Sequence, residues 1–382
     1  MSLMRPIKQG LARVLGGGGG DYSVTVPVMD GPLKPNDVIE ATGRIAHIPG
    51  GANIAEIDGT LVASRGPDLL TVSASGEAAP RGTYDADITA LAVSDRGAIA
   101  LGLSGRGVVI ENPDGTRRHV DSAGDRALTC VTALAFLPDG ALAITNGSAE
   151  FAPEAWFHDL MHHGASGVVA VLDPGADTAT LVATGLRYPS GICPIDGSAD
   201  RLAVSEAWRH RLVEISRTGR KVVGDLTEEL PLYPSRIVPL RDGGYALCNL
   251  SVRSQLIEFV LRERRYLRRM IRDVPPEFWI APALSSKHSF KEPLQAGGVI
   301  RLGIHKPWAP TRSYGAIVGL TPDFHPAWSA HSRADGHRHG VTSLVQTSQG
   351  LVALAQGNGD LFAISETGAP LAQAEDTAKD AS

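Results

Sequence analysis

The sequence predicts an all-β fold, a six-bladed β-propeller, from three observations: a repeated hairpin, a composition rich in turn residues, and few helical patterns. Residues 88–99 (ITALAVSDRGAI) and 131–142 (VTALAFLPDGAL) are copies of one strand–turn–strand unit about 43 residues apart. Weaker copies occupy residues 52–64, 188–206, 233–250 and 341–357. The 43 glycines and 25 prolines agree with many short strands.

Further strand pairs separate these copies, so one unit holds about four strands in 40–45 residues, the size of a propeller blade. Six units are expected near residues 45–85, 86–128, 129–185, 186–230, 231–304 and 315–364. We therefore expect a flexible N-terminal segment (1–40), a propeller (41–366) and a disordered C-terminal tail (367–382).

Composition excludes several functions. The 382 residues carry 36 Lys and Arg against 41 Asp and Glu, a formal charge of −5, which argues against a generally basic nucleic-acid binder. No apolar run is long enough for a transmembrane helix or a signal peptide, so a cytoplasmic location is expected. The cysteines, Cys130, Cys193 and Cys248, lack metal-ligand spacing and are expected to be buried thiols.

An insertion over about 251–296 interrupts the fifth blade and contains a predicted helix over 255–273. One face of this helix is expected to carry Leu256, Phe259, Val260, Leu267 and Ile271. The other face carries Arg262, Arg264, Arg265, Arg268, Arg269 and Arg272. Three interpretations remain open: a solvated face on a packed helix, a lid or self-association surface, and a contact with an anionic surface.

A second excursion, over 148–167, is rich in aromatic residues and histidine. His158, His162 and His163 have a spacing that a metal pair would use, but no nearby carboxylate or cysteine other than Asp159 is available as a further ligand. A loop that caps a pocket, with Trp156 supplying aromatic area, and ordinary packing are the alternatives.

Three consecutive segments carry a family resemblance: NGSAEFAPEAWFHDLMHHGASGVVAVLDP, LRYPSGICPIDGSADRLAVSEAWRHRLVEI and LYPSRIVPLRDGGYALCNL. The chain resembles, over about 45–364, the strictosidine synthase-like group of six-bladed propellers, which is related to regucalcin, gluconolactonase and paraoxonase. That group includes lactonases, phosphotriesterases, amine–aldehyde condensing enzymes and proteins without an assigned activity. The resemblance therefore implies the fold more specifically than the reaction.

The resemblance also implies which positions to test for metal binding. The hydrolytic branch holds calcium on the axis with a Glu, two Asn and an Asp. Here these positions fall at 49–51 (Pro-Gly-Gly), Thr132, Ser190 and Ser235, which Arg236 follows. We expect no cofactor, and calcium is disfavoured beside a guanidinium. The base of strictosidine synthases, a Glu in the sixth blade, falls at Thr342, which disfavours that reaction.

A candidate site follows at the axial mouth. The expected substrate-binding residues are Asn53, Thr132, Ser190, Ser235, Arg236, Thr342 and Trp156. The expected catalytic residues are His339, His337 and Glu206. We expect an ester or lactone hydrolase that acts on a small anionic organic substrate. The alternatives are a non-catalytic scaffold that docks a partner or an anionic surface through 255–273, and a C–N lyase or synthase.

Overall fold

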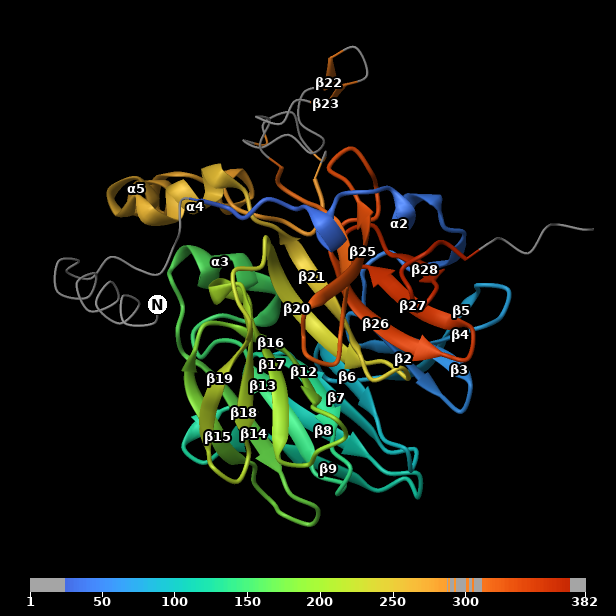
Figure 1. Cartoon of the computed structure of the whole chain (residues 1–382). Coiled ribbons are helices and arrows are strands. Elements are labelled where there is room, and N and C mark those ends of the chain that lie inside the picture. The colour runs from blue at the N-terminus through green and yellow to red at the C-terminus, as the bar shows by residue number, and fades with distance from the viewer. Residues whose placement is uncertain are drawn as a thin grey trace, which may run out of the picture.

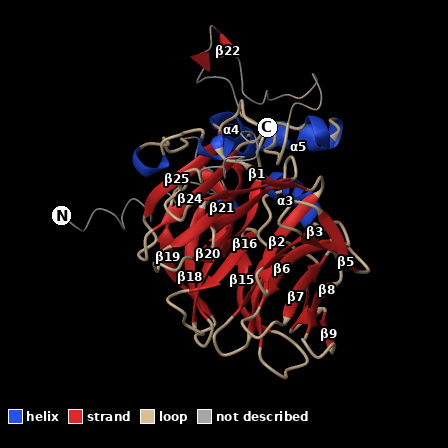
Figure 2. Ribbon diagram, turned by 90° about the vertical axis from the view of Figure 1, so that its right-hand side faces the viewer, coloured by secondary structure: helices blue, strands red, loops and turns tan. Residues whose placement is uncertain are grey.

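The computed structural model describes residues 25–286, 288, 292, 300–301, 304–305 and 311–371. Six four-stranded antiparallel sheets surround a central axis, which confirms the predicted six-bladed propeller (Figure 1). The helices gather at one end of the strands (Figure 2). None of the helices in the described part of the chain combines the length and apolar character needed to span a bilayer.

The first three blades follow the repeat in the sequence. Blade 1 contains β2 (Gly51–Ile57), β3 (Thr60–Arg65), β4 (Asp68–Val72) and β5 (Ala78–Thr83). Blade 2 contains β6 (Ile88–Val93), β7 (Ile99–Leu103), β8 (Gly107–Glu111) and β9 (Arg117–Val120). Blade 3 contains β12 (Val131–Phe136), β13 (Leu142–Asn146), β14 (Gly167–Leu172) and β15 (Thr180–Leu186), and the short pair β10 (Ser122–Ala123) and β11 (Arg126–Ala127) precedes it.

The two clearest copies of the repeat form hairpins whose turns have the backbone conformation that their glycines favour. Gly97, between β6 and β7, and Gly140, between β12 and β13, have φ angles of +79° and +85°, a region that favours glycine. Each turn is closed by a backbone hydrogen bond, from Ser94 N to Ala98 O in blade 2 (2.8 Å) and from Leu137 N to Ala141 O in blade 3 (2.8 Å).

The later blades depart from the predicted boundaries. Blade 4 contains β16 (Pro189–Pro194), β17 (Arg201–Glu206), β18 (Arg211–Ser216) and β19 (Lys221–Thr227). Blade 5 contains β20 (Leu232–Pro239), β21 (Tyr245–Val252), β24 (Gly315–Leu320) and β25 (Pro326–Ser332). The predicted sixth unit over 315–364 was wrong at its start, because the insertion separates β24 from its partner β21 in the sequence.

Blade 6 is completed by the N-terminal part of the chain. It contains β26 (Val341–Thr347), β27 (Gly350–Ala355) and β28 (Asp360–Ile364), and β1 (Arg44–His47) is its outermost strand. β1 pairs antiparallel with β28, with Ala46 opposite Leu361. The predicted first unit therefore began too early, since residues 45–47 belong to the last blade.

The N-terminal segment up to β1 lies against blades 5 and 6. Residues 25–40 of the segment predicted as flexible are described, and they include η1 (Gly31–Leu33) and the start of α2 (Val38–Ala41). Ile39 is fully buried among side chains of blades 5 and 6, so the prediction of flexibility was wrong here. Residues 1–24 and 372–382 lie outside the described residues.

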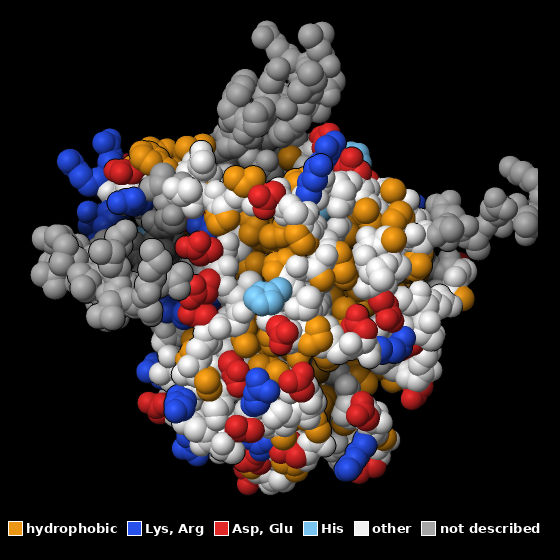
Figure 3. Space-filling model, viewed as in Figure 1, with side chains coloured by type: hydrophobic (Ala, Val, Ile, Leu, Met, Phe, Trp, Pro, Cys, Tyr) orange, Lys and Arg blue, Asp and Glu red, His pale blue; other side chains and the backbone are white. Residues whose placement is uncertain are grey.

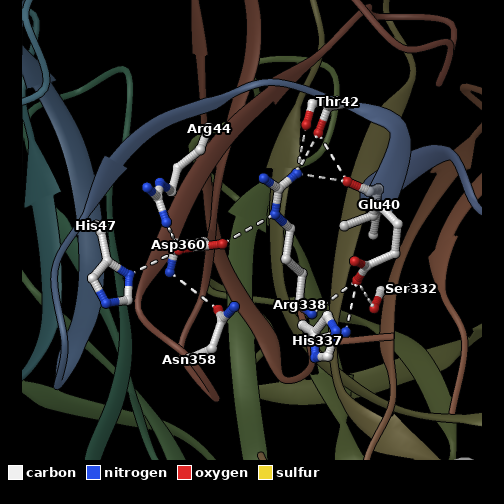
Figure 4. A network of polar contacts seen from close by, with 10 residues as sticks. Glu40, Thr42, Arg44, His47, Ser332, His337, Arg338, Asn358 and Asp360 are labelled. Carbon is white, nitrogen blue, oxygen red and sulfur yellow. Dashed lines mark hydrogen bonds and ion pairs between the residues drawn. The ribbon is translucent and has the colours of Figure 1, made fainter. Parts of the chain in front are cut away.

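Polar contacts fix this segment, which we call the N-terminal strap (residues 36–47) (Figure 4). Arg338, in the loop between β25 and β26, donates from Nη1 to Ile39 O (2.7 Å) and Thr42 O (2.9 Å), and from Nε to Asp360 Oδ2 (3.2 Å). Glu40 Oε1 accepts the backbone N–H groups of His337 and Arg338 (both 2.9 Å). The loop therefore ties the strap to the ring.

Two excursions supply the helices at one end of the propeller. The first contains η2 (Pro153–Ala155) and α3 (Trp156–Met161). The second lies within blade 5 and contains α4 (Gln255–Arg262), α5 (Arg264–Asp273), η4 (Pro276–Phe278), β22 (Ile300–Arg301) and β23 (Ile304–His305). A further turn, η3 (Ala207–Arg209), follows β17.

The insertion differs from its prediction in detail. β21 extends to Val252, so the insertion begins after 251, and its predicted end at 296 lies outside the described residues. The single helix expected over 255–273 is two helices, broken at Glu263. Val260 and Leu267 are buried as predicted, but Leu256 and Phe259 are exposed because Ile257 and Leu261 face the propeller instead.

The three cysteines are free and buried, as predicted. Cys193 packs between blades 4 and 5, and Cys248 between blades 5 and 6. Cys130 lies in the cluster beneath the helices, beside Trp156, Tyr188 and Trp208. Burial raises the pKa of the Cys130 thiol to about 12, which keeps it protonated at neutral pH.

Candidate functional site

The innermost strand of every blade has an irregular register close to its first residues. In five of these strands the second residue is skipped, and in β20 the skipped positions include Ser235 and Arg236. A β-bulge turns a side chain away from its regular direction. The bulged residues that line the axial pocket are Ala52, Thr89, Thr132, Ser190, Ser235, Arg236 and Thr342.

The axial pocket has a volume of about 280 Å³, at the low end of the range for small-molecule sites. Pro153, Glu154 and Trp156 line it from the first excursion, and Leu284 lines it from the second. The excursion over 148–167 therefore caps a pocket, as one of its interpretations expected. Asp87, Tyr188, Leu250 and Gln356 complete the polar and apolar walls.

A larger cavity, of about 750 Å³, lies at the other ends of the same strands. Its lining comes mainly from blades 2 and 3, including the turn residues Asp95 and Asp139. The axial pocket is the better candidate despite its smaller volume, because residues of all six blades converge there around one guanidinium.

Arg236 crosses the axis from β20. Its Nη2 donates to Thr89 O (2.7 Å), and its Nη1 donates to Thr342 O (3.0 Å) and, more weakly, to Ala52 O (3.5 Å). These carbonyls belong to bulged residues of blades 2, 6 and 1. A guanidinium has five N–H donors, so two remain for a ligand.

The guanidinium of Arg236 has no ion-pair partner among the described residues. Burial lowers the pKa of Arg236 to about 10, which still leaves the group charged at neutral pH. The pocket therefore contains a fixed guanidinium without an ion-pair partner in the described part of the chain, a feature that favours the binding of an anion.

The hydroxyl groups beside Arg236 mainly connect blades. Thr132 Oγ1 donates to Pro189 O (2.6 Å), and Ser190 Oγ donates to Pro234 O (2.8 Å). These bonds join blade 3 to blade 4 and blade 4 to blade 5. Thr342 Oγ1 donates to Gln356 Oε1 (2.8 Å). Because their protons are used in this way, these hydroxyls offer a ligand acceptor atoms more readily than donors.

The structure brings six of the seven predicted substrate-binding residues to the pocket: Thr132, Ser190, Ser235, Arg236, Thr342 and Trp156. Asn53 is not among the lining residues. Its Nδ2 donates to Ser64 Oγ (2.7 Å) and Ile88 O (2.8 Å), which places it between blades 1 and 2. The bulge falls on Ala52, and one residue of offset along a strand reverses the direction of a side chain.

Glu206 does not line the pocket, contrary to its expected place at the axial mouth. Its side chain is fully buried at the end of β17, where Oε1 accepts Arg187 N (2.7 Å) and Oε2 accepts Arg211 Nε (2.8 Å). A carboxylate with these partners holds β17 to its neighbours.

The predicted acid–base residues His337 and His339 also lie outside the pocket lining. The backbone N–H of His337 is bound to Glu40 in the strap (Figure 4). His339 is buried, with Nδ1 against Ser313 Oγ (2.7 Å) and Nε2 against Arg333 O (2.8 Å). Both ring nitrogens of His339 thus have hydrogen-bonding partners. The loop that contains His337 and His339 connects the strap to blades 5 and 6.

Sequence reasoning missed four polar residues of the pocket: Thr89, Asp87, Glu154 and Gln356. A signal for Thr89 was present, since it holds in ITALAV the place that Thr132 holds in VTALAF. Asp87 and Glu154 are exposed carboxylates, and Glu154 accepts Ser104 Oγ (3.2 Å). They come from a loop and from the first excursion, where no repeat indicates their position.

Two of the three histidines of the first excursion, His158 and His162, pack against aromatic rings. His158 lies edge-on to Trp279, with ring centroids 4.7 Å apart. His162 Nδ1 lies 2.8 Å from His158 O. Burial lowers the pKa of His163 to about 4, so this ring stays neutral at neutral pH. No group of three or more His, Cys, Asp or Glu in the described residues is placed to hold a metal ion.

The bulged positions around the axis do not offer the set of donor atoms that calcium prefers. The bulged positions supply hydroxyls, a methyl group and a guanidinium, whereas calcium prefers several carboxylate and carbonyl oxygens. Three carbonyls that face the axis are already bound to Arg236. A divalent cation at this place would also be repelled by the charge of that side chain.

Comparison with solved structures gives the same architecture. A gluconolactonase from Xanthomonas campestris aligns with a TM-score of 0.53 and 14% identity, over 88% of this chain and 95% of that one. Regucalcin from Agrobacterium tumefaciens, described as a calcium-binding protein, aligns with a TM-score of 0.52 and 13% identity, over 87% of this chain and 97% of that one.

No protein-family model and no curated protein matches the sequence. At such low identity, the likeness to solved structures establishes the fold and leaves the activity to be argued from the site. The chain is thus a six-bladed β-propeller of the architecture shared by gluconolactonase and regucalcin.

Proposed function

We propose that the axial pocket binds a small organic anion that carries an ester or lactone group and hydrolyses it without calcium. The observation that carries this proposal is Arg236, a charged guanidinium held on the axis by carbonyls of three other blades and lacking an acidic partner among the described residues. A carboxylate group of the substrate would supply that partner.

The remaining steps use groups that line the same pocket. Water is the nucleophile, and Asp87 or Glu154 accepts its proton as it attacks the ester carbonyl. The acyl C–O bond of the ester or lactone then breaks, and the same carboxyl group returns the proton to the departing alkoxide oxygen. Trp156 and Leu284 cover the pocket and limit its contact with bulk water. The hydrolase reaction is supported by the gluconolactonase fold as an analogy, whereas the preference for an anion is supported by Arg236.

The test is a hydrolysis assay on paired lactones and aryl esters that differ by one carboxylate, with and without a chelator. We expect the anionic member of each pair to be favoured and chelation to have no effect. The variant R236Q should lower kcat/KM for the anionic substrates by at least about tenfold, because a charged hydrogen bond is lost. D87N and E154Q, assayed separately, identify the base by a fall in kcat.

The matched control is R118Q, because Arg118 lines the larger cavity at the other end of the strands. It should leave the rates unchanged. A fully folded protein that neither hydrolyses any pair nor is stabilised by small carboxylates would contradict the proposal. Binding of carboxylates that R236Q abolishes, without turnover, would keep the anion site and remove the hydrolase reaction.

A further inference from the structure

The outer face of α4 and α5 carries apolar side chains without a partner in the structure. Leu256, Phe259 and Tyr266 are 36%, 49% and 50% exposed, and they are among the few large apolar side chains with so much exposure. Leu256 and Phe259 stand one helical turn apart on α4, so their side chains share a face. Exposed aromatic and aliphatic groups of this kind mark a contact surface more often than ordinary solvent-facing positions.

The same face is strongly cationic. Residues 255–273 contain six arginines and three acidic residues, in a chain whose total formal charge is −5. One of the acids, Glu258, is fully buried and faces the propeller, so it does not offset the outer arginines. Figure 3 shows the basic side chains gathered at one edge, over α5, with hydrophobic side chains beside them. We call this surface the cationic face; it comprises Leu256, Phe259, Arg262, Arg265, Tyr266, Arg268 and Arg269.

Buried contacts of α4 hold the cationic face against the propeller. Glu258 on α4 is bound to Arg253 Nε (3.3 Å) and to Tyr233 Oη (3.1 Å). Ile257, Val260 and Leu261 are buried against the aromatic cluster that underlies the helices. The exposed side chains are thus presented by a fixed scaffold at the end of the propeller where the axial pocket is capped.

We propose that the cationic face docks this protein on a membrane surface that contains anionic lipids. Arginines attract the lipid headgroups, and the aromatic and aliphatic side chains enter the interfacial layer. A bilayer fits this surface because exposed apolar side chains and arginines stand together on two helices at one edge of the molecule. The proposal is independent of the hydrolase reaction.

Three other occupants are less complementary. Residues 1–24 contain the basic residues Arg5, Lys8 and Arg13 and the acidic residue Asp21. Their net charge therefore has the same sign as that of the cationic face. Residues 372–382 are acidic, but they follow β28, which lies on the opposite side of the molecule from α5 in Figure 1. A second copy of the chain would need to cover one arginine surface with another.

The experiment measures co-sedimentation of the full chain with vesicles of phosphatidylcholine, alone or mixed with phosphatidylglycerol. We expect binding to the mixed vesicles only, and its loss in concentrated salt. R265Q/R269Q should weaken binding by about 25-fold, at about fivefold for each charge near the surface. F259S/Y266S should weaken binding while leaving its salt dependence in place.

The matched control is R81Q/R220Q, which removes two exposed arginines of blades 1 and 4. This pair should bind as the parent chain does. Equal binding to both kinds of vesicle, or equal losses in R265Q/R269Q and the control, would overturn the proposal. So would binding that appears only after residues 372–382 are removed, or a parent dimer that R265Q/R269Q converts to monomer, since the face would then be occupied by this chain itself.

Discussion

At the scale of single residues, one guanidinium links four of the six blades. Arg236 belongs to blade 5 and donates to carbonyls of blades 6, 1 and 2. Thr132 and Ser190 connect blades 3, 4 and 5 through hydroxyl groups. The side chains that line the axial pocket therefore also hold the ring together, and a substitution among them affects stability as well as binding.

Removing either connecting hydroxyl is expected to destabilise the fold. T132V and S190A each leave a buried backbone carbonyl, of Pro189 or Pro234, without its donor, at a cost of about 1–3 kcal/mol. Urea denaturation measures the loss in unfolding free energy. T342V is the control, because its hydroxyl bonds a side chain of the pocket and not a neighbouring blade. Equal losses in all three variants would show that the connection between blades has no special effect.

The positions around the axis could largely be predicted from the repeat together with the family resemblance. The family resemblance assigns Thr132, Ser190, Ser235 and Thr342 to the axis, and the structure places all four in the pocket. Asn53 was predicted to line the pocket, but its neighbour Ala52 takes that place, because the bulge in β2 is not visible in the sequence. Asp87 and Glu154 could not be predicted, since they reach the pocket from segments that do not repeat.

At the scale of elements, the N-terminal strap determines the hydrogen-bonding partners of the loop over 335–339. Histidines in this loop suggested proton transfer, since histidine titrates near neutral pH. Their environment depends instead on Glu40 and Thr42, which lie about 300 residues away in the chain and meet the loop only when β1 completes blade 6. A sequence read locally cannot show such a contact. The insertion in the fifth blade could be recognised in the sequence, but because of its length the start of blade 6 was predicted too early.

The stability that the N-terminal strap gives to the folded chain is expected to depend on pH through Glu40. Burial acts to raise the pKa of this carboxyl, but hydrogen bonds from Ser332, Arg338 and His337 outweigh it and leave the pKa below its ordinary value. A depressed pKa contributes stability that is complete above the unfolded-state value of about 4.3 and is lost as the pH falls further. The unfolding free energies of the parent and E40Q should therefore differ most at neutral pH and converge in acid.

This difference is measured by urea denaturation of both proteins across the acidic range. E77Q, which removes an exposed carboxylate between β4 and β5, is the control for the loss of a charge. A difference between the parent and E40Q that stays constant down to strongly acidic pH would show that Glu40 acts as a neutral acceptor in the folded protein.

At the scale of the whole molecule, the ring is closed at its rim and at its centre by different means. Strand β1 completes blade 6 at the rim. At the centre, the carbonyls that point to the axis are bound by Arg236. A cation belonging to the chain itself thus binds oxygen atoms that would otherwise be open to a metal ion, and we propose that the fold does not require one.

Calcium is therefore expected to leave the stability of this propeller unchanged. An ion that binds the folded state alone adds about 2.7 kcal/mol when its concentration is a hundred times its Kd, and this would raise the Tm. Thermal unfolding with calcium and with a chelator should give the same Tm, and titration calorimetry should show no saturable heat. Magnesium is the control for general salt effects. A saturable calcium heat of micromolar affinity, accompanied by a higher Tm, would mean that Arg236 leaves the axis and that carboxylates such as Asp87 and Glu154 bind the ion in its place.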